Sequence, residues 1–96
     1  MISEYDDSKL SDKLTYIFIA VDEQIKNNLC KYRKHPTIEH SLAVLLEEVE
    51  ELKQEVFRKE IRRSAGALYQ ELKDVAAVAI RAILDLDLQR EDYRNQ

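Results

Sequence analysis

Two pairs of acidic residues lie within otherwise apolar sequence at helical spacing. Glu48 and Glu51 are three residues apart in the run 42–55, and Glu71 and Asp74 have the same spacing further along the chain. Side chains at positions i and i+3 of an α-helix have Cβ atoms about 5–6 Å apart, which is close enough for two carboxylates to share one cation. If the two helices pack together, the pairs can face each other. The spacing therefore predicts a metal site with four carboxylate ligands.

The chemistry of these side chains indicates which ion they would bind. Carboxylate oxygens are hard, anionic ligands, which suit Mg²⁺ or Mn²⁺ better than the softer metals that prefer sulfur and imidazole. The alternative is a solvated acidic face, because Glu is a good helix former. For Glu47 and Glu50 that alternative is at least as good, since both lie away from the edge that carries Glu48 and Glu51. We therefore expect Mg²⁺ as the cofactor, with Mn²⁺ as a substitute.

The acidic pattern resembles the signature of an enzyme family. Glu47-Glu48-Val-Glu-Glu51, followed after a gap by Glu71-Leu-Lys-Asp74-Val, is similar to the Glu-Glu-x-x-Glu … Glu-x-x-Asp motif of the MazG-like, all-α nucleoside triphosphate pyrophosphohydrolases. The resemblance covers about half of the chain. It implies that Glu48, Glu51, Glu71 and Asp74 are the magnesium ligands, with Glu47 as the adjoining acid.

The resemblance also implies a reaction. The expected enzyme is a hydrolase that cleaves a nucleoside or deoxynucleoside triphosphate between the α- and β-phosphates, which releases a nucleoside monophosphate and pyrophosphate. Metal ions neutralise the charge that develops on the phosphates and lower the pKa of the attacking water. The carboxylates expected in catalysis are Glu48 and, as a weaker candidate, Glu47, which would orient the water or bind a second ion.

Three further residues are candidates for binding substrate, and each has an ordinary structural alternative. Arg81 would hold a phosphate or form an ion pair with an acid such as Asp85. Lys31 begins a short basic patch that would attract triphosphate, although cations at the carboxyl end of a helix also neutralise its dipole, which is the better interpretation. Tyr16 would stack on a nucleobase or contact another subunit. His35 has no recognisable catalytic or zinc partner in the sequence.

Composition narrows the classes of protein and partner. The 96 residues include one Gly and one Pro, with 45% hydrophobic and 35% charged residues, which predicts a helix-rich chain that forms a single domain over residues 1–96. The resemblance implies that this domain is MazG-like. A net charge of −4 argues against general nucleic acid binding. The amino terminus lacks the pattern of a signal peptide, and the aliphatic run 75–80 is too short to cross a bilayer. We expect a cytoplasmic protein that binds neither nucleic acid nor membrane.

Hydrophobic periodicity predicts an antiparallel bundle of about three main helices. The first should cover roughly residues 10–32, the second should run from an N-cap at Thr37 to about Arg62, and the third should follow a connection at 64–66 and end near Leu88. An apolar stripe on each helix is expected to be its packing face. The stripes are Leu10, Leu14, Ile17, Phe18, Val21, Ile25, Leu29 and Tyr32 on the first helix, Leu42, Leu45, Val49, Leu52 and Val56 on the second, and Leu68, Leu72, Val75, Ala79, Ala82 and Leu86 on the third.

The third helix is apolar on more than one side, with Ile80 and Leu84 projecting away from its main stripe. A helix that is apolar nearly all round is usually buried, and two other helices cannot easily cover it. We therefore expect oligomerisation to complete the bundle, as a homodimer at least, with residues 75–88 in the interface.

Two other functions fit the same pattern. One is a non-catalytic helical dimer that acts as an interaction or regulatory module. The other is an enzyme similar to phosphoribosyl-ATP pyrophosphohydrolase, which is also short and all-helical with a similar acidic pattern. Both acidic pairs are complete in this chain, which favours an enzyme over the module.

Overall fold

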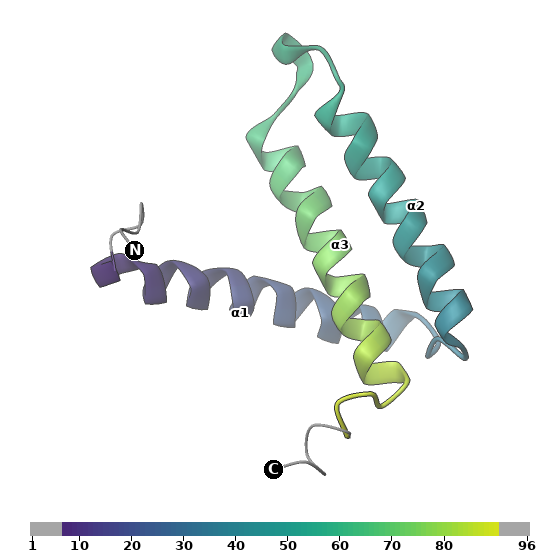
Figure 1. Cartoon of the computed structure of the whole chain (residues 1–96). Coiled ribbons are helices and arrows are strands. Elements are labelled where there is room, and N and C mark those ends of the chain that lie inside the picture. The colour runs from purple at the N-terminus through teal and green to yellow at the C-terminus, as the bar shows by residue number, and fades with distance from the viewer. Residues whose placement is uncertain (1–6, 91–96) are drawn as a thin grey trace, which may run out of the picture.

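The structure, a computed structural model, describes residues 7–90, which form three α-helices and one short 3-10 helix joined by connecting segments (Figure 1). In chain order they are α1 (Asp7–Lys31), α2 (Ile38–Val56), η1 (Glu60–Arg62) and α3 (Ala65–Asp85). No β-strand occurs among the described residues. The predicted all-α class with three main helices is confirmed. None of the described helices combines the length and the apolar character that crossing a membrane requires.

The helices α2 and α3 form an antiparallel hairpin, and each begins at a side-chain cap (Figure 1). The hydroxyl of Thr37 accepts a hydrogen bond from the backbone N–H of His40 at 3.1 Å, which confirms the predicted cap of the second helix. Ser64, predicted to lie in the connection, is the cap of α3 and accepts from the N–H of Ala67 at 3.0 Å. Both hydroxyls satisfy backbone donors that the first helical turn leaves free.

The carboxyl-terminal ends of the second and third helices were predicted less accurately than their amino-terminal caps. The second helix stops at Val56 instead of continuing to Arg62, because Phe57 leaves the helical conformation at φ −91° and ψ 4°. The third helix stops at Asp85, three residues before the predicted Leu88. There the backbone of Asp87 is left-handed, with φ 57°. No Gly or Pro marks either reversal, so the sequence contained no clear stop signal.

The helix α1 crosses α3, and its amino-terminal half extends beyond the hairpin (Figure 1). Val21 and Ile25 of α1 meet Ala77 of α3, and these three are the buried hydrophobic residues of the described chain. This core is small, and the radius of gyration is 16.0 Å, against roughly 13 Å for a compact domain of this size. The single chain is therefore an open arrangement of a hairpin and a projecting helix.

Only part of each predicted apolar stripe is covered, since Leu45 and Leu52 on α2 and Leu68 and Val75 on α3 are partly buried. The buried residues of the two helices are Ser41 and Glu55 on α2, and Ala77, Arg81 and Asp85 on α3. Leu42 and Leu72, both in the predicted stripes, are 51% and 54% exposed. The buried charged side chains of both helices find their partners on the same helix or in the connecting segments. The apolar side chains of α3 are thus left partly uncovered within this chain.

Candidate metal centre and the adjoining pocket

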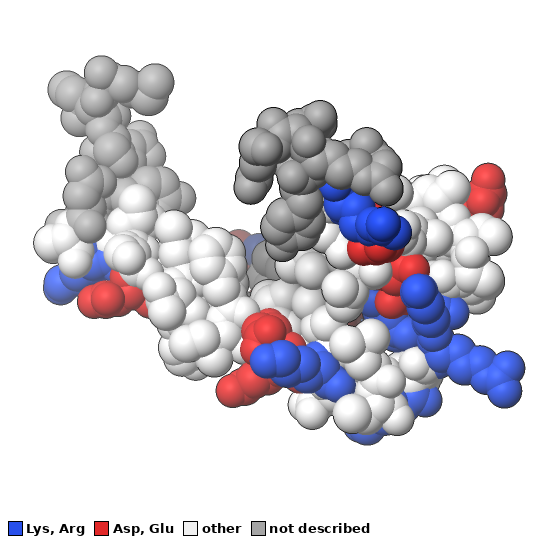
Figure 2. Space-filling view, turned by 90° about the horizontal axis from the view of Figure 1, so that it is seen from below, with Lys and Arg blue, Asp and Glu red and all other residues white. Residues whose placement is uncertain are grey.

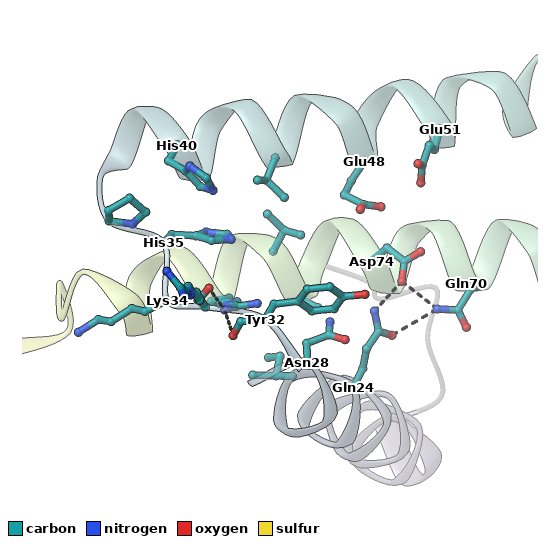
Figure 3. A pocket seen from close by; sticks show the side chains of 17 residues that line it. Gln24, Asn28, Tyr32, Lys34, His35, His40, Glu48, Glu51, Gln70 and Asp74 are labelled. Atoms are coloured by element: carbon teal, nitrogen blue, oxygen red, sulfur yellow. Dashed lines mark hydrogen bonds between the residues drawn. The ribbon is translucent and has the colours of Figure 1, made fainter. Parts of the chain in front are cut away.

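The hairpin brings the two acidic pairs together. One carboxylate oxygen from each of four residues lies within 4.8 Å of the others, and the residues are Glu48, Glu51, Glu71 and Asp74. The i, i+3 spacing places both members of each pair on one side of their helix, and the antiparallel packing sets the pairs opposite each other. Figure 3 shows Glu48 and Glu51 reaching down from α2 toward Asp74 on α3. The structure thus assembles the predicted ligand set from two helices.

Two oxygens in this cluster are buried without a hydrogen-bond donor. They are Oε2 of Glu48 and Oε2 of Glu71, and neither has a partner among the described residues. A buried carboxylate oxygen without a partner carries a desolvation penalty that a bound cation would remove. The donor set is hard and consists only of oxygen, so the residues fit Mg²⁺ or Mn²⁺.

The cluster also perturbs the acidity of its members. Burial, followed by the negative charges of Glu51 and Asp74, raises the pKa of Glu48 to about 7. Burial and the charge of Asp74 likewise raise the pKa of Glu71. In the absence of an ion, the cluster therefore retains protons to limit the repulsion between its carboxylates.

A pocket of about 1020 Å³ adjoins the cluster and lies between the second half of α1, the segment 32–37, α2 and α3 (Figure 3). Glu48, Glu51 and Asp74 line one part of it. Figure 3 shows His35 and His40 at the other end of the pocket, with the ring of Tyr32 between the two ends. The pocket therefore combines a carboxylate wall with aromatic and imidazole side chains.

The histidine end of the pocket is tied to α3 by a buried polar network. Asp85 accepts a hydrogen bond from the backbone N–H of His35 at 2.8 Å and from Nε of Arg81 at 3.1 Å. The ring Nδ1 of His35 lies 2.9 Å from the hydroxyl oxygen of Ser41. Burial and the neighbouring charge of Arg81 lower the pKa of His35, which favours its neutral imidazole.

Of the three residues proposed to bind substrate, only Arg81 lines the pocket. Its guanidinium, however, pairs with Asp85 and donates to the carbonyl oxygens of residues 32 and 33. These contacts agree with the alternative role of Arg81, an ion pair with Asp85. Lys31 and Tyr16 are both exposed and lie outside the pocket lining, Tyr16 with 71% of its surface accessible. Glu47 is also exposed and outside the carboxylate cluster.

Several pocket residues were not identified from the sequence as candidates. They are Gln24, Asn28 and Tyr32 of the first helix and its end, His35 and His40 beside Pro36, and Gln70 on α3. Tyr32 was not a candidate because it belongs to the predicted apolar stripe of the first helix and was expected to pack against another helix. The polar residues of α1 reach the carboxylates only because α1 crosses α3.

The chain has no significant match among protein-family models, curated proteins or solved structures.

Proposed function

We propose that this protein is a Mg²⁺-dependent nucleoside triphosphate pyrophosphohydrolase, which converts an NTP or dNTP to the monophosphate and pyrophosphate. The observation that carries the proposal is the four-carboxylate cluster at the pocket wall, with two buried oxygens that lack donors. The similarity of the acidic pattern to the MazG-like signature supports the choice of reaction. The pocket volume is at the upper end of the range that is usual for small-molecule sites.

In this mechanism Glu48, Glu51, Glu71 and Asp74 hold the metal. The bound metal supplies charge neutralisation at the phosphates and lowers the pKa of the attacking water. Glu48 is the first candidate to accept the proton of that water, because it belongs to the carboxylate cluster beside which the water would bind. Glu47 has a weaker claim, since it is exposed and lies outside the cluster. The nucleoside part of the substrate would occupy the remainder of the pocket.

The test is a substrate screen that identifies the products. Wild-type protein with Mg²⁺ is incubated with the NTPs, the dNTPs and phosphoribosyl-ATP, and pyrophosphate and orthophosphate are measured separately. We expect pyrophosphate together with a monophosphate. Release of orthophosphate alone would contradict the proposal and indicate a phosphatase, whereas turnover of phosphoribosyl-ATP alone would narrow the substrate class.

The matching variant is Asp74→Asn. It removes one ligand charge but keeps a carbonyl that accepts the hydrogen bonds now made to Oδ1 by Gln24 and Gln70. We expect turnover to fall by at least about a hundredfold with little change in folding, because the metal loses a ligand. Glu60→Gln is the control, since Glu60 is an exposed acid in η1, away from the cluster. Activity that survives Asp74→Asn undiminished would contradict the assignment of the carboxylate cluster as the active site, and a wild-type protein without activity would favour the non-catalytic dimer.

A further inference from the structure

Two glutamine side chains converge on one oxygen of the metal cluster. Nε2 of Gln24 donates to Oδ1 of Asp74 at 2.5 Å, and Nε2 of Gln70 donates to the same oxygen at 2.8 Å. Gln70 also approaches Oε1 of Gln24 at 3.3 Å, which links the two amides. Figure 3 shows this triangle beside Glu48 and Glu51, on the side of the pocket formed by α1 and α3. Neither glutamine belongs to the acidic signature.

The network orients every group in it. An amide group donates only through nitrogen and accepts only through oxygen. Because Gln24 donates to Asp74 and accepts from Gln70, its amide has one orientation that satisfies both contacts. Both donors meet Oδ1, so Oδ2 of Asp74 is left free of these two hydrogen bonds. The arrangement restricts rotation of the carboxylate and leaves one of its oxygens for a cation.

We infer that Gln24 and Gln70 are positioning residues, which hold the Asp74 carboxylate in the orientation that binds the metal. The inference rests on the metal centre of the proposed function but not on its reaction. Hydrogen-bond partners behind a metal ligand fix the orientation of that ligand, and their loss typically costs about 10–100-fold in metal affinity or activity.

This assignment makes α1 part of the metal centre. Gln24 is 50 residues away from Asp74 in sequence and belongs to a helix that carries none of the four carboxylates. Its neighbours Val21 and Ile25 form the buried contact with Ala77, one turn after Asp74 on α3. The same packing that buries the small core therefore places the Gln24 amide at the cluster.

The experiment measures Mn²⁺ affinity without nucleotide, by electron paramagnetic resonance of free Mn²⁺, in Gln24→Met and Gln70→Met. Methionine keeps the length of the side chain but cannot donate. We expect each variant to bind Mn²⁺ at least about tenfold more weakly than wild type. In the double variant the loss should be smaller than the product of the single losses, since both amides act on one carboxylate. Gln54→Met is the control, because Gln54 is an exposed residue of α2 outside the pocket lining.

The melting temperature of the metal-free variants separates positioning from simple packing. A structural contact alone would lower the metal-free melting temperature and leave the Mn²⁺ affinity unchanged, and this result would overturn the inference. Gln70 is exposed, so its variant is expected to fold even if Gln24→Met does not. Unchanged affinity in variants of an active enzyme refutes the positioning role alone. Weakened affinity in a protein that never releases pyrophosphate supports that role and refutes the proposed reaction.

Discussion

At the scale of single residues, the four carboxylates that could bind an ion repel one another in the ion-free protein, and this repulsion lowers its stability. Glu48 is partly buried beside three other carboxylates, and this environment raises its pKa from the ordinary value of 4.5 to about 7. In a protein of modest size, such repulsion is a substantial part of the small net free energy of unfolding. The metal-free protein should therefore respond to pH through this residue.

The sign of that response follows from proton linkage. Between about pH 4.5 and pH 7 the folded protein binds more protons at Glu48 than the unfolded chain does, so its contribution to stability falls as pH rises through this window. Glu71 acts in the same direction, since its pKa is also raised. We expect Glu48→Gln to raise the free energy of unfolding at pH 7.5, by on the order of 1–3 kcal/mol after allowance for solvent screening, and by much less at pH 5.

The measurement is urea unfolding of both proteins at the two pH values, first in EDTA and then in Mg²⁺. Saturating Mg²⁺ should stabilise the wild type at pH 7.5, because the ion binds the folded state alone. The variant should gain much less from Mg²⁺. An equal difference between the two proteins at pH 5 and pH 7.5 would show that the carboxylates do not repel one another as inferred.

At the scale of the elements, a charged clamp attaches the segment 32–37 to α3. Arg81 and Asp85 form an ion pair at 3.1 Å with side chains that are 7% and 4% exposed. Arg81 also donates to the carbonyl oxygen of Tyr32 at 3.1 Å, and Asp85 accepts from the N–H of His35. Backbone groups of the connection are thus satisfied by the pair. The clamp determines where His35 lies at the end of the pocket.

Removing half of this clamp should destabilise the protein strongly. Arg81→Met leaves the Asp85 carboxylate buried without its cation, and breaking a buried pair in this way typically costs about 3–5 kcal/mol. Urea unfolding should show that loss. Lys26→Met is the matched control, because Lys26 pairs with Asp22 at the same i, i+4 spacing on the exposed side of α1, where ion pairs contribute little. An Arg81→Met protein with normal stability but weaker substrate binding would favour the phosphate-binding alternative.

At the scale of the whole molecule, the described part of the chain exposes many large apolar side chains and buries few. The accessible surface of the chain is 8046 Å², against roughly 5700 Å² for a compact monomer of this mass. The projecting half of α1 is mostly uncharged on the face seen in Figure 2. Phe18 on this helix is 64% exposed and Ile80 of α3 is 46% exposed, and both line a shallow apolar groove between the two helices.

We therefore predict that the protein is at least a homodimer, with α3 in the interface and this groove of α1 and α3 as part of it. Light scattering at micromolar concentration should give a mass of at least twice 11.3 kDa. Phe18→Glu and Ile80→Glu should each shift the protein toward monomer, since a buried charge opposes association. Ile61→Glu is the control, because Ile61 lies in η1, away from the groove. A stable wild-type monomer would contradict the prediction.

The helices and the four carboxylates were predictable because both are local properties of the sequence. Apolar periodicity identifies a helix, and i, i+3 spacing places two acids on one side of it regardless of what packs nearby. The cap at Thr37 has the same local character, since its hydroxyl reaches a backbone N–H three residues on. Helix ends without Gly or Pro, as at Val56, carried no such signal.

Only the tertiary structure decided which faces meet and what surrounds the carboxylates. Leu42 was expected in a packing face and is half exposed, while Arg81 and Asp85 are buried because each satisfies the other. The contact of Gln24 with Asp74 joins residues 50 positions apart. Such a contact depends on how α1 crosses α3, and that crossing results from the packing of Val21, Ile25 and Ala77 and not from any spacing within one helix.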